Sequence, residues 1–387
     1  MTTSEVDPLG RPPGAPALEP LRSIHTCSFA QLLADLGASV LVTTYQAGKL
    51  VILRSDAGVL NTHFRNLDRP TGLAYDGARL AIGCGLEVWE FHNVPAVCAK
   101  LDASNEYPSA GAQHDACFLP RRSHCTGDVQ IHEMEFVDQE VADAESLREL
   151  IFVNTAFSCL AKRSDRYSFE PTWRPAFITH LLPGDNCHLN GLAIRDGRVR
   201  YVTALGEADE PGGWRAKKRD GGVLIDVDAN EVVVRGLSMP HSPRWHNGRL
   251  WLLESGEGTL GTVDLATGRY EPIAQFSGFT RGVSFFGPLA FVGLSQVRES
   301  AVFSGIPLVD RLKDAEQRVC GVWVLNIETG QTLGFCRFED GVQEIFALQV
   351  LPGARFPDLV NHDVELVGRS YTLADEALAE VPANLRS

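Results

Sequence analysis

The chain lacks the cysteine patterns of a disulfide-stapled or thiolate-metal protein. Its nine cysteines are odd in number, and no two of them form a Cys-x-x-Cys pair. A disulfide framework needs an even, regularly spaced set, and a thiolate zinc site needs closely spaced pairs. We therefore expect the cysteines to be reduced and mostly buried as small hydrophobic side chains.

Long apolar runs and basic clusters are also missing. No segment approaches the roughly 20 apolar residues that span a bilayer. The N-terminus shows no basic stretch followed by an apolar one, the pattern of a secretory signal. The formal net charge is −14, from 35 Lys and Arg against 49 Asp and Glu. The sequence thus argues against a membrane or nucleic acid as a partner, and we expect a cytoplasmic protein.

Common catalytic motifs are absent too. No serine lies in a Gly-x-Ser-x-Gly elbow. The glycine-rich stretch 256–258 lacks the lysine and the following helix of a phosphate-binding loop. Function has to be sought in the arrangement of side chains across the fold.

What the chain does contain is a repeat. The clearest copy, residues 187–202, reads as a short apolar strand, an Asp-Gly turn and a second alternating strand, which is a strong hairpin signal. The copies are spaced by roughly 40 to 60 residues, within the range of propeller blades. The copies begin at Pro70, Ile131, Cys187, Pro240, Thr280 and Gln343.

The repeat predicts an all-β fold, a six-bladed β-propeller. Strands expected over 39–44, 49–53 and 58–64 have no inner strand before them, whereas the last copy has an inner strand and little after it. The economical solution is that the N-terminal and C-terminal strands share one blade. Sharing closes the ring and hides both sheet edges, which are otherwise sites of aggregation.

We expect three regions along the chain. Residues 1–22 are rich in proline and predict a disordered leader. Residues 23–370 form the single propeller domain, beginning with a short helix over 28–37. Residues 371–387 form a C-terminal tail. Just before it, 364–367 is strand-like.

Two long irregular insertions interrupt the repeat, at 95–127 and 295–318. Loops of this length inside a compact repeat are usually functional or mobile. They are the surfaces we expect a protein partner to use.

Polar side chains recur at the start of the inner strands, which line the central channel of a propeller. Alignment of the copies places six positions at nearly the same level: Thr71, His132, Asn190, His241 or Ser242, Arg281 or Thr280, and Glu344. His188 lies two residues before Asn190, so both side chains point the same way in an extended strand. Residues far apart in the sequence would converge at one mouth of the channel.

This composition predicts a metal centre. His132, His188 and His241, with Glu344 as fourth ligand or general base, form a plausible set for Zn, Fe or Cu. Glu133 and Asp185 could hold a ligand imidazole in its tautomer. Arg281 could clamp a carboxylate or phosphate with its planar fork, and Thr71 and Asn190 would complete the substrate site. His114, His124 and His246 are further candidate ligands, although His246 sits at a predicted hairpin tip, a position typical of the surface.

The leading function hypothesis is a metal-dependent oxidoreductase or hydrolase that acts on a small molecule or peptide. Two alternatives remain open. In the first, the channel is polar but inert, and the protein is a scaffold that binds other proteins through its insertions. In the second, the protein is a metal-free sensor of a sugar or peptide. A one-residue slip in any blade would turn a histidine to the other face of its strand.

Several stretches resemble a family of conserved hypothetical bacterial proteins that carry a propeller-like unit, sometimes beside tetratricopeptide repeats. The matching stretches are HLNGLA at 188–193, MPHSPRW at 239–245, VTTYQAG at 42–48, IHEM at 131–134 and FVGLSQVRE at 291–299. The resemblance covers about residues 28 to 355. It implies a bacterial origin and a single domain of unknown function, with no activity or catalytic residue to carry over.

Overall fold

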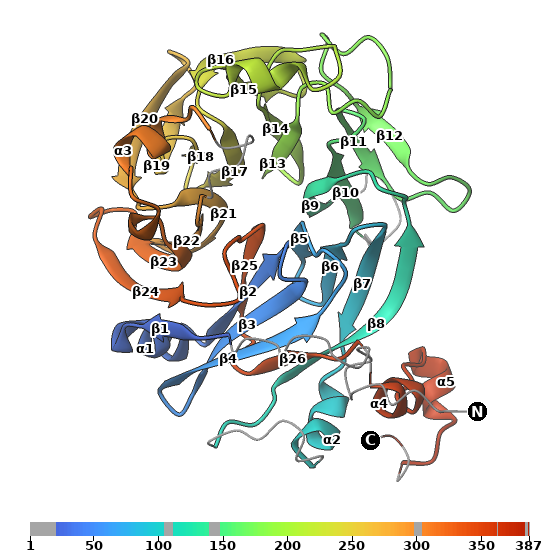
Figure 1. Cartoon of the computed structure of the whole chain (residues 1–387). Helices are drawn as coiled ribbons and strands as arrows, with labels where there is room; N and C mark the ends of the chain where they lie inside the picture. The colour runs from blue at the N-terminus through green and yellow to red at the C-terminus, as the bar shows by residue number, and fades with distance from the viewer. Residues whose placement is uncertain are drawn as a thin grey trace, which may run out of the picture.

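The computed structural model describes residues 21–103, 111–138, 148–297, 304–361, 363–383 and 386. Six antiparallel sheets of four strands each stand around a central axis, and two of them gain one further edge strand (Figure 1). The predicted six-bladed β-propeller is confirmed. Of the predicted leader 1–22, all but Leu21 and Arg22 lies outside the described residues. Within the described ranges, no helix is long and apolar enough to cross a membrane.

Blades are named A to F, and their strands are given from the channel outwards. Blade A is β25 (Ala347–Pro352), β2 (Ala38–Thr44), β3 (Lys49–Asp56) and β4 (Val59–Asn66). Blade B is β5 (Leu73–Tyr75), β6 (Arg79–Gly83), β7 (Glu87–Asn93) and β8 (Ala116–Cys125). Blade C is β9 (Ile131–Val137), β10 (Glu149–Asn154), β11 (Cys159–Lys162) and β12 (Glu170–Trp173).

The remaining blades follow the same order. Blade D is β13 (Leu189–Arg195), β14 (Arg198–Ala204), β15 (Gly222–Asp226) and β16 (Glu231–Leu237). Blade E is β17 (Pro240–His246), β18 (Arg249–Glu254), β19 (Thr259–Asp264) and β20 (Arg269–Gln275). Blade F is β21 (Phe279–Phe286), β22 (Leu289–Ser295), β23 (Cys320–Asn326) and β24 (Thr332–Phe338).

Blade A closes the ring as the sequence predicted. Its innermost strand β25 comes from the C-terminal part of the chain and pairs antiparallel with β2, with Val40 opposite Val350. The predicted N-terminal helix is also present, as α1 (Cys27–Leu36), and packs Phe29 and Leu33 against blades A and F. Closure gives blade A the same arrangement as the others, with its inner strand paired to the second strand of the blade.

The hydrophobic core lies between the blades. One cluster, for example, packs Leu41 and Ile52 of blade A against Leu80, Ile82 and Phe91 of blade B. The alternation of side chains along a strand presents one apolar face to each neighbouring blade. The orientation of each inner strand is therefore fixed by the blades on both sides.

Inner strands of neighbouring blades approach one another closely. At Gly72, at the entry to β5, an added Cβ would lie 2.8 Å from the carbonyl oxygen of His132 in blade C. Hydroxyls of second strands or of the turns after them also cross to the next blade. Thr155, Ser255 and Ser295 donate to the carbonyls of Leu189, Thr280 and Ile345, respectively. These contacts hold the entries of the inner strands at one level.

Several expectations needed correction. The insertion 95–127 is not irregular throughout, because β8 forms the outer strand of blade B and α2 (Cys98–Ala103) precedes it. The stretch expected to be strand-like at 364–367 is a helix, α4 (Val364–Gly368), capped by the Asp363 side chain. Of the insertion 295–318, residues 298–303 lie outside the described residues, and α3 (Pro307–Arg311) follows them.

Two short strands were not predicted. β1 (Ser23–His25) pairs with the outer strand of blade F, and β26 (Pro357–Leu359) pairs parallel with β8. Asp358 of β26 is fully buried and accepts two hydrogen bonds from Arg65. This pair fixes the segment that follows the closing strand onto blades A and B. Helices α4 and α5 (Asp375–Ala379) then lie outside the ring (Figure 1).

Thr43 tests the importance of closure. Its buried hydroxyl donates to the carbonyl of Thr71 in blade B and accepts from the amide of Ala347 in the closing strand. Thr43→Val keeps the shape but leaves both backbone groups without this partner, and we expect a loss of about 1–3 kcal/mol in unfolding free energy. Urea unfolding measures it, with exposed Thr332→Val as the control. Equal midpoints for both variants would contradict this role.

Candidate functional site

Six side chains stand at one level around the channel, one from the entry of each inner strand. Taken in blade order from A, they are Phe346, Thr71, His132, Asn190, His241 and Arg281. The carbonyls of Leu189 and Thr280, which directly precede Asn190 and Arg281, each accept a hydrogen bond from a hydroxyl of the preceding blade. The carbonyl of Ile345 accepts the same kind of bond, so the next residue, Phe346, takes the ring position in blade A. Glu344 lies two residues earlier, at the level of His188.

The residue two places before the ring has a left-handed backbone in four blades. Its φ is 45° at Arg69, 54° at Gln130, 51° at His188 and 47° at Met239. Residues other than glycine rarely adopt this conformation, at a cost of order 1–3 kcal/mol. The conformation turns the chain into the inner strand. It also places a second layer of side chains next to the first.

His132 is held in one tautomer. Its Nδ1 lies 3.2 Å from the Gln130 carbonyl oxygen, which can only accept a hydrogen bond. Nδ1 also lies 2.8 Å from the Thr155 hydroxyl, which already donates its own hydrogen bond to the Leu189 carbonyl. Nδ1 therefore carries the hydrogen and Nε2 the lone pair. Among the described residues Nε2 has no hydrogen-bond partner. Burial, with His188, Arg281 and His241 nearby, lowers the pKa of His132 well below its ordinary value.

His241 repeats this arrangement in blade E. Its Nδ1 lies 2.9 Å from the Met239 carbonyl oxygen and 3.1 Å from the Ser255 hydroxyl. Ser255 donates its own proton to Thr280, so the imidazole again donates from Nδ1. Burial and the positive charge of Arg281 lower the pKa of His241 well below its ordinary value. Both imidazoles are neutral at pH 7.

His188 is oriented by a carboxylate. Its Nδ1 lies 2.8 Å from Asp185 Oδ1, and the other oxygen of Asp185 accepts from Trp214 at 3.0 Å and from Arg215 at 3.2 Å. The indole of Trp214 also packs on the imidazole, with 4.5 Å between ring centroids. Asp185 thus holds the imidazole of His188 through Nδ1, the contact that the sequence suggested. The side chain of His188 is 15% exposed, so the ring is not fully enclosed by protein.

The three imidazoles converge as predicted. Ring centroids are 4.7 Å apart for His132 and His188, nearly perpendicular, and 6.5 Å apart for His132 and His241. In the part of the chain that the structure describes, however, no three His, Cys, Asp or Glu side chains stand in metal-ligating geometry. The expected metal ligands are neighbours, but they do not form a finished coordination site as they stand.

Arg281 and Glu344 form a pair beside the histidines. Arg281 donates to Glu344 Oε1 at 3.2 Å, and its guanidinium lies 3.6 Å from the ring centroid of Phe346. Burial lowers the pKa of Arg281, while the Glu344 charge acts in the opposite direction. The pair is close to neutral overall. Both groups are already engaged, one as donor and the other as acceptor.

Asn190 and Thr71, the expected substrate-binding residues, differ in their surroundings. Asn190 donates to Pro240 in blade E and accepts from Thr203, so its amide holds neighbouring strands together. Thr71 is buried, and its hydroxyl oxygen has no hydrogen-bond partner among the described residues. The Thr71 hydroxyl is therefore the one of the two that has bonding capacity to offer a ligand.

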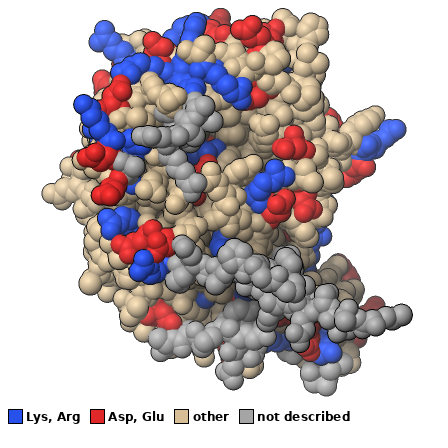
Figure 2. Space-filling view, in the orientation of Figure 1, with Lys and Arg blue, Asp and Glu red and all other residues tan. Residues whose placement is uncertain are grey.

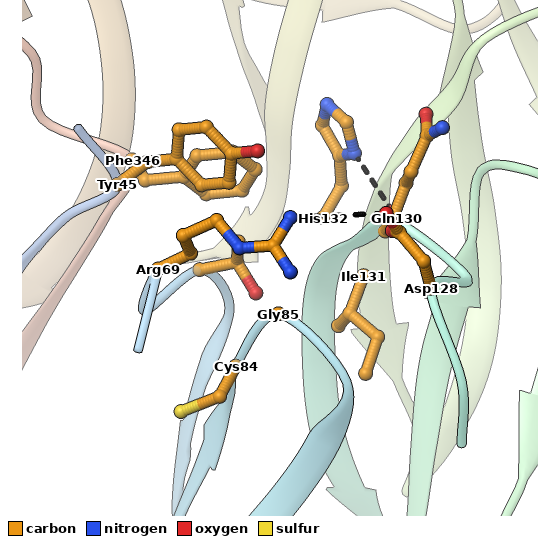
Figure 3. Close-up of a pocket in the computed structure, with 10 residues that line it drawn as sticks. Tyr45, Arg69, Cys84, Gly85, Asp128, Gln130, Ile131, His132 and Phe346 are labelled. Carbon is orange, nitrogen blue, oxygen red and sulfur yellow. Dashed lines mark hydrogen bonds and ion pairs between the residues drawn. The ribbon is translucent and has the colours of Figure 1, made fainter. Parts of the chain in front are cut away.

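A cavity of about 160 Å³ opens beside His132, where blades A, B and C meet (Figure 3). The guanidinium of Arg69 projects into the middle of this group, between Gly85 and the rings of Tyr45 and Phe346 (Figure 3). The remaining lining residues are Thr71, Cys84, Asp128, Gln130 and Ile131. Arg69, Gln130, Tyr45 and Phe346 were not predicted. They lie on the entry turns and the β2–β3 turn, which carry no motif.

Other predicted residues lie elsewhere or have other partners. Glu133 accepts from Arg244 at 2.8 Å and from the Leu192 amide at 3.1 Å, so it does not orient an imidazole. His114 is buried beside Asp102, at 2.7 Å, and Asp358, in the closure region. His124 lies on outer strand β8 and bonds to the Ser168 carbonyl. Neither of these two histidines joins the channel cluster.

The face of the molecule seen in Figure 2 has mixed charge. Lys and Arg side chains lie among Asp and Glu over the visible face, in the orientation of the ring in Figure 1 (Figure 2).

Comparison with known proteins gives one family and distant structural likenesses. A family model described as Domain of unknown function (DUF4915) matches residues 27–360. No curated protein matches. A chain of a nidogen/laminin complex is 8% identical, with a TM-score of 0.49 over 82% of this chain and 99% of that one. A protein of unknown function from Bacteroides caccae is 9% identical, with a TM-score of 0.46 over 81% and 98%. Likenesses this distant carry no functional argument.

The neutral histidines make stability depend on pH. The folded pKa of His132 and His241 lies below the unfolded value of about 6.5, so the unfolded chain binds more protons and unfolding free energy falls as pH drops below 6.5. Each group contributes a slope of at most about 1.4 kcal/mol per pH unit. In the His132→Asn/His241→Asn variant, whose amides keep a donor near Nδ1, urea unfolding from pH 7.5 to 5 should show a shallower slope. The exposed His180→Asn should match wild type, and an unchanged slope in the double variant would refute the assignment.

Proposed function

The chain belongs to the DUF4915 family, and we propose that this propeller is an enzyme that removes a proton from a small polar substrate at the channel mouth. His188 is the general base. The observation that carries this proposal is the chain of contacts from Trp214 and Arg215 through Asp185 to His188 Nδ1. A carboxylate that fixes the tautomer of a histidine and stabilises its charged form is the arrangement that general-base catalysis requires.

The steps follow from this geometry. The proton of a substrate group, or of a water that attacks the substrate, passes to His188 Nε2. The resulting imidazolium is stabilised by Asp185, whose other oxygen accepts hydrogen bonds from Trp214 and Arg215. The proton then returns to the product or to solvent. Neutral His132, whose ring touches that of His188, offers a hydrogen-bond acceptor that orients a substrate hydroxyl or amide.

A polar but inert channel explains these contacts less well. A residue that only stabilised the ring would be expected to have both ring nitrogens satisfied by protein. Instead, each of the three imidazoles uses Nδ1 for the scaffold and leaves Nε2 without a partner among the described residues. Three acceptor edges close together favour a ligand that brings hydrogen-bond donors or positive charge.

Variants of His188 and Asp185 test the proposal. The purified protein is incubated with a bacterial metabolite extract, and compounds that change are followed by mass spectrometry and by deuterium uptake from D2O. His188→Gln should slow the reaction by about 10²–10⁴-fold, and Asp185→Asn should slow it and shift its pH profile. His246→Gln, at the outer end of β17 and stacked on Phe285, is the matched control and should leave turnover unchanged. Turnover that survives in His188→Gln would refute the assignment.

A metal centre is the second candidate. One specific observation favours it: all three imidazoles donate from Nδ1 to fixed acceptors, and this pattern orients histidine ligands in metal sites. A bound Zn, Fe or Cu would supply Lewis-acid or redox chemistry, with Glu344 as a further oxygen donor. The rings would have to move, since no ligating cluster is formed by the described residues.

Metal analysis separates the two candidates. A metal centre predicts about one equivalent of Zn, Fe or Cu per chain, by mass spectrometry on protein purified without a histidine tag, and its loss in His132→Ala/His241→Ala. No retained metal after reconstitution would exclude the centre and leave the general-base mechanism. Metal that persists in the double variant would also count against these ligands.

A further inference from the structure

We propose that the cavity beside His132 is a binding site for the carboxylate of a small organic acid, with Arg69 as its anchor. The inference deepens the proposed function, on which it rests for the identity of the reacting groups. It names the substrate class and moves the anion-binding role from Arg281, where the sequence placed it, to Arg69.

The backbone around Arg69 is built to place its guanidinium. Arg69 has a φ of 45°, and the following residue is Pro70. The guanidinium then lies flat on Gly85: a Cβ at this position would be 2.4 Å from one terminal nitrogen of Arg69 and 2.6 Å from Nε. A strained residue and a bare glycine beneath the side chain are features that a merely solvated arginine does not need.

Arg69 also has donors to spare. Its nearest carboxylates, Asp68 and Asp128, are both 3.7 Å away and more than half exposed, so these pairs are long and screened by water. The neighbouring Tyr45 hydroxyl raises the pKa of Arg69. Arg281, by contrast, is committed to Glu344 and Phe346. A guanidinium offers five N–H donors in a planar fork that suits a carboxylate.

A second donor faces the same cavity. The hydroxyl of Thr71 is buried, and it has no hydrogen-bond partner among the described residues. A buried hydroxyl without a hydrogen-bond partner costs about 1–3 kcal/mol of free energy. A ligand that accepts a hydrogen bond from the Thr71 hydroxyl would recover this cost. Arg69 and Thr71 come from the same strand entry, two residues apart. They can serve the two oxygens of one carboxylate.

The walls of the cavity favour an organic acid over an inorganic anion. Tyr45, Phe346 and Ile131 supply apolar surface against which a carbon skeleton packs, and inorganic phosphate would gain nothing from it. The cavity volume of about 160 Å³ suits a short acid. Asp128 on the rim disfavours a second negative charge in the ligand.

The position of the cavity links binding to chemistry. His132 lines the cavity, and its ring also contacts that of His188. A ligand whose carboxylate sits on Arg69 extends past His132 towards the His188–Asp185 pair. The reacting group would therefore lie a few bonds from the carboxylate.

Direct binding of simple probes tests the inference without any knowledge of the substrate. Propionate and benzoate, their neutral amides and inorganic phosphate are titrated into the full chain by calorimetry and ligand-observed NMR. The acids should bind at least about 10-fold more tightly than the amides and phosphate. Arg69→Gln and Gly85→Ala should each weaken acid binding at least about 10-fold, and Thr71→Val less. Arg166→Gln is the matched control, because Arg166 is an exposed arginine near a tyrosine, Tyr167, and should bind as wild type does.

Each result has a defined meaning. Equal affinity of acids and amides, or unchanged binding in Arg69→Gln, would overturn the inference, and so would tighter binding of phosphate. Circular dichroism and the unfolding midpoint show whether each variant is folded as wild type is. Gly85→Ala provides a second variant that tests the site independently of Arg69→Gln. Should His188→Gln bind benzoate normally yet retain turnover, the proposed function fails while the carboxylate site stands. The converse outcome, catalysis that depends on His188 without Arg69-dependent binding, refutes the carboxylate site alone.

Discussion

The rest of the molecule depends on closure of the ring by the pairing of β25 with β2. Each blade buries its two faces against its neighbours, so the rotation of every inner strand is fixed only when the circle is complete. The channel-mouth residues come from different blades, and those of one blade are far in the sequence from those of the next. The geometry of the site is thus a product of the whole ring, held to the precision of its packed interfaces.

The charges at the mouth are nearly balanced, and this balance sets what the site can do. Arg281 is matched by Glu344 and Arg215 by Asp185, while burial holds His132 and His241 neutral. In such surroundings a weakly paired group stands out, because the low local polarity strengthens any new contact it makes. Arg69 and the Thr71 hydroxyl are the groups of this kind that the structure shows beside the histidines.

Much of this architecture was readable from the sequence. The Asp-Gly turn at 196–197 and the apolar runs around it gave the blade, and the unmatched strands at the two ends gave the closure. The convergence of His132, His188 and His241 was predicted by aligning the copies around the channel, although His188 has a left-handed backbone and not the extended one that was expected. The sequence did not predict the cavity residues Tyr45, Arg69 and Phe346. Their positions depend on left-handed turns and on packing across three blades, and neither leaves a periodic signal in the sequence. Whether the three imidazoles form a metal site depends on the position of each ligand atom to within less than an ångström. An alternation pattern in the sequence does not carry this information.

The shared blade also has a consequence for biosynthesis. Thr43 and Ala347, which meet in the closing pair, are 304 residues apart in the chain. At about 5–20 residues per second, a ribosome needs roughly 15–60 s to synthesise that interval. During this time β2 has an unpaired edge, and the histidines of blades C, D and E have no fixed orientation. The nascent chain must therefore carry an open sheet for most of its synthesis, so strand edges and apolar blade faces would be natural targets for chaperones until the last strand emerges.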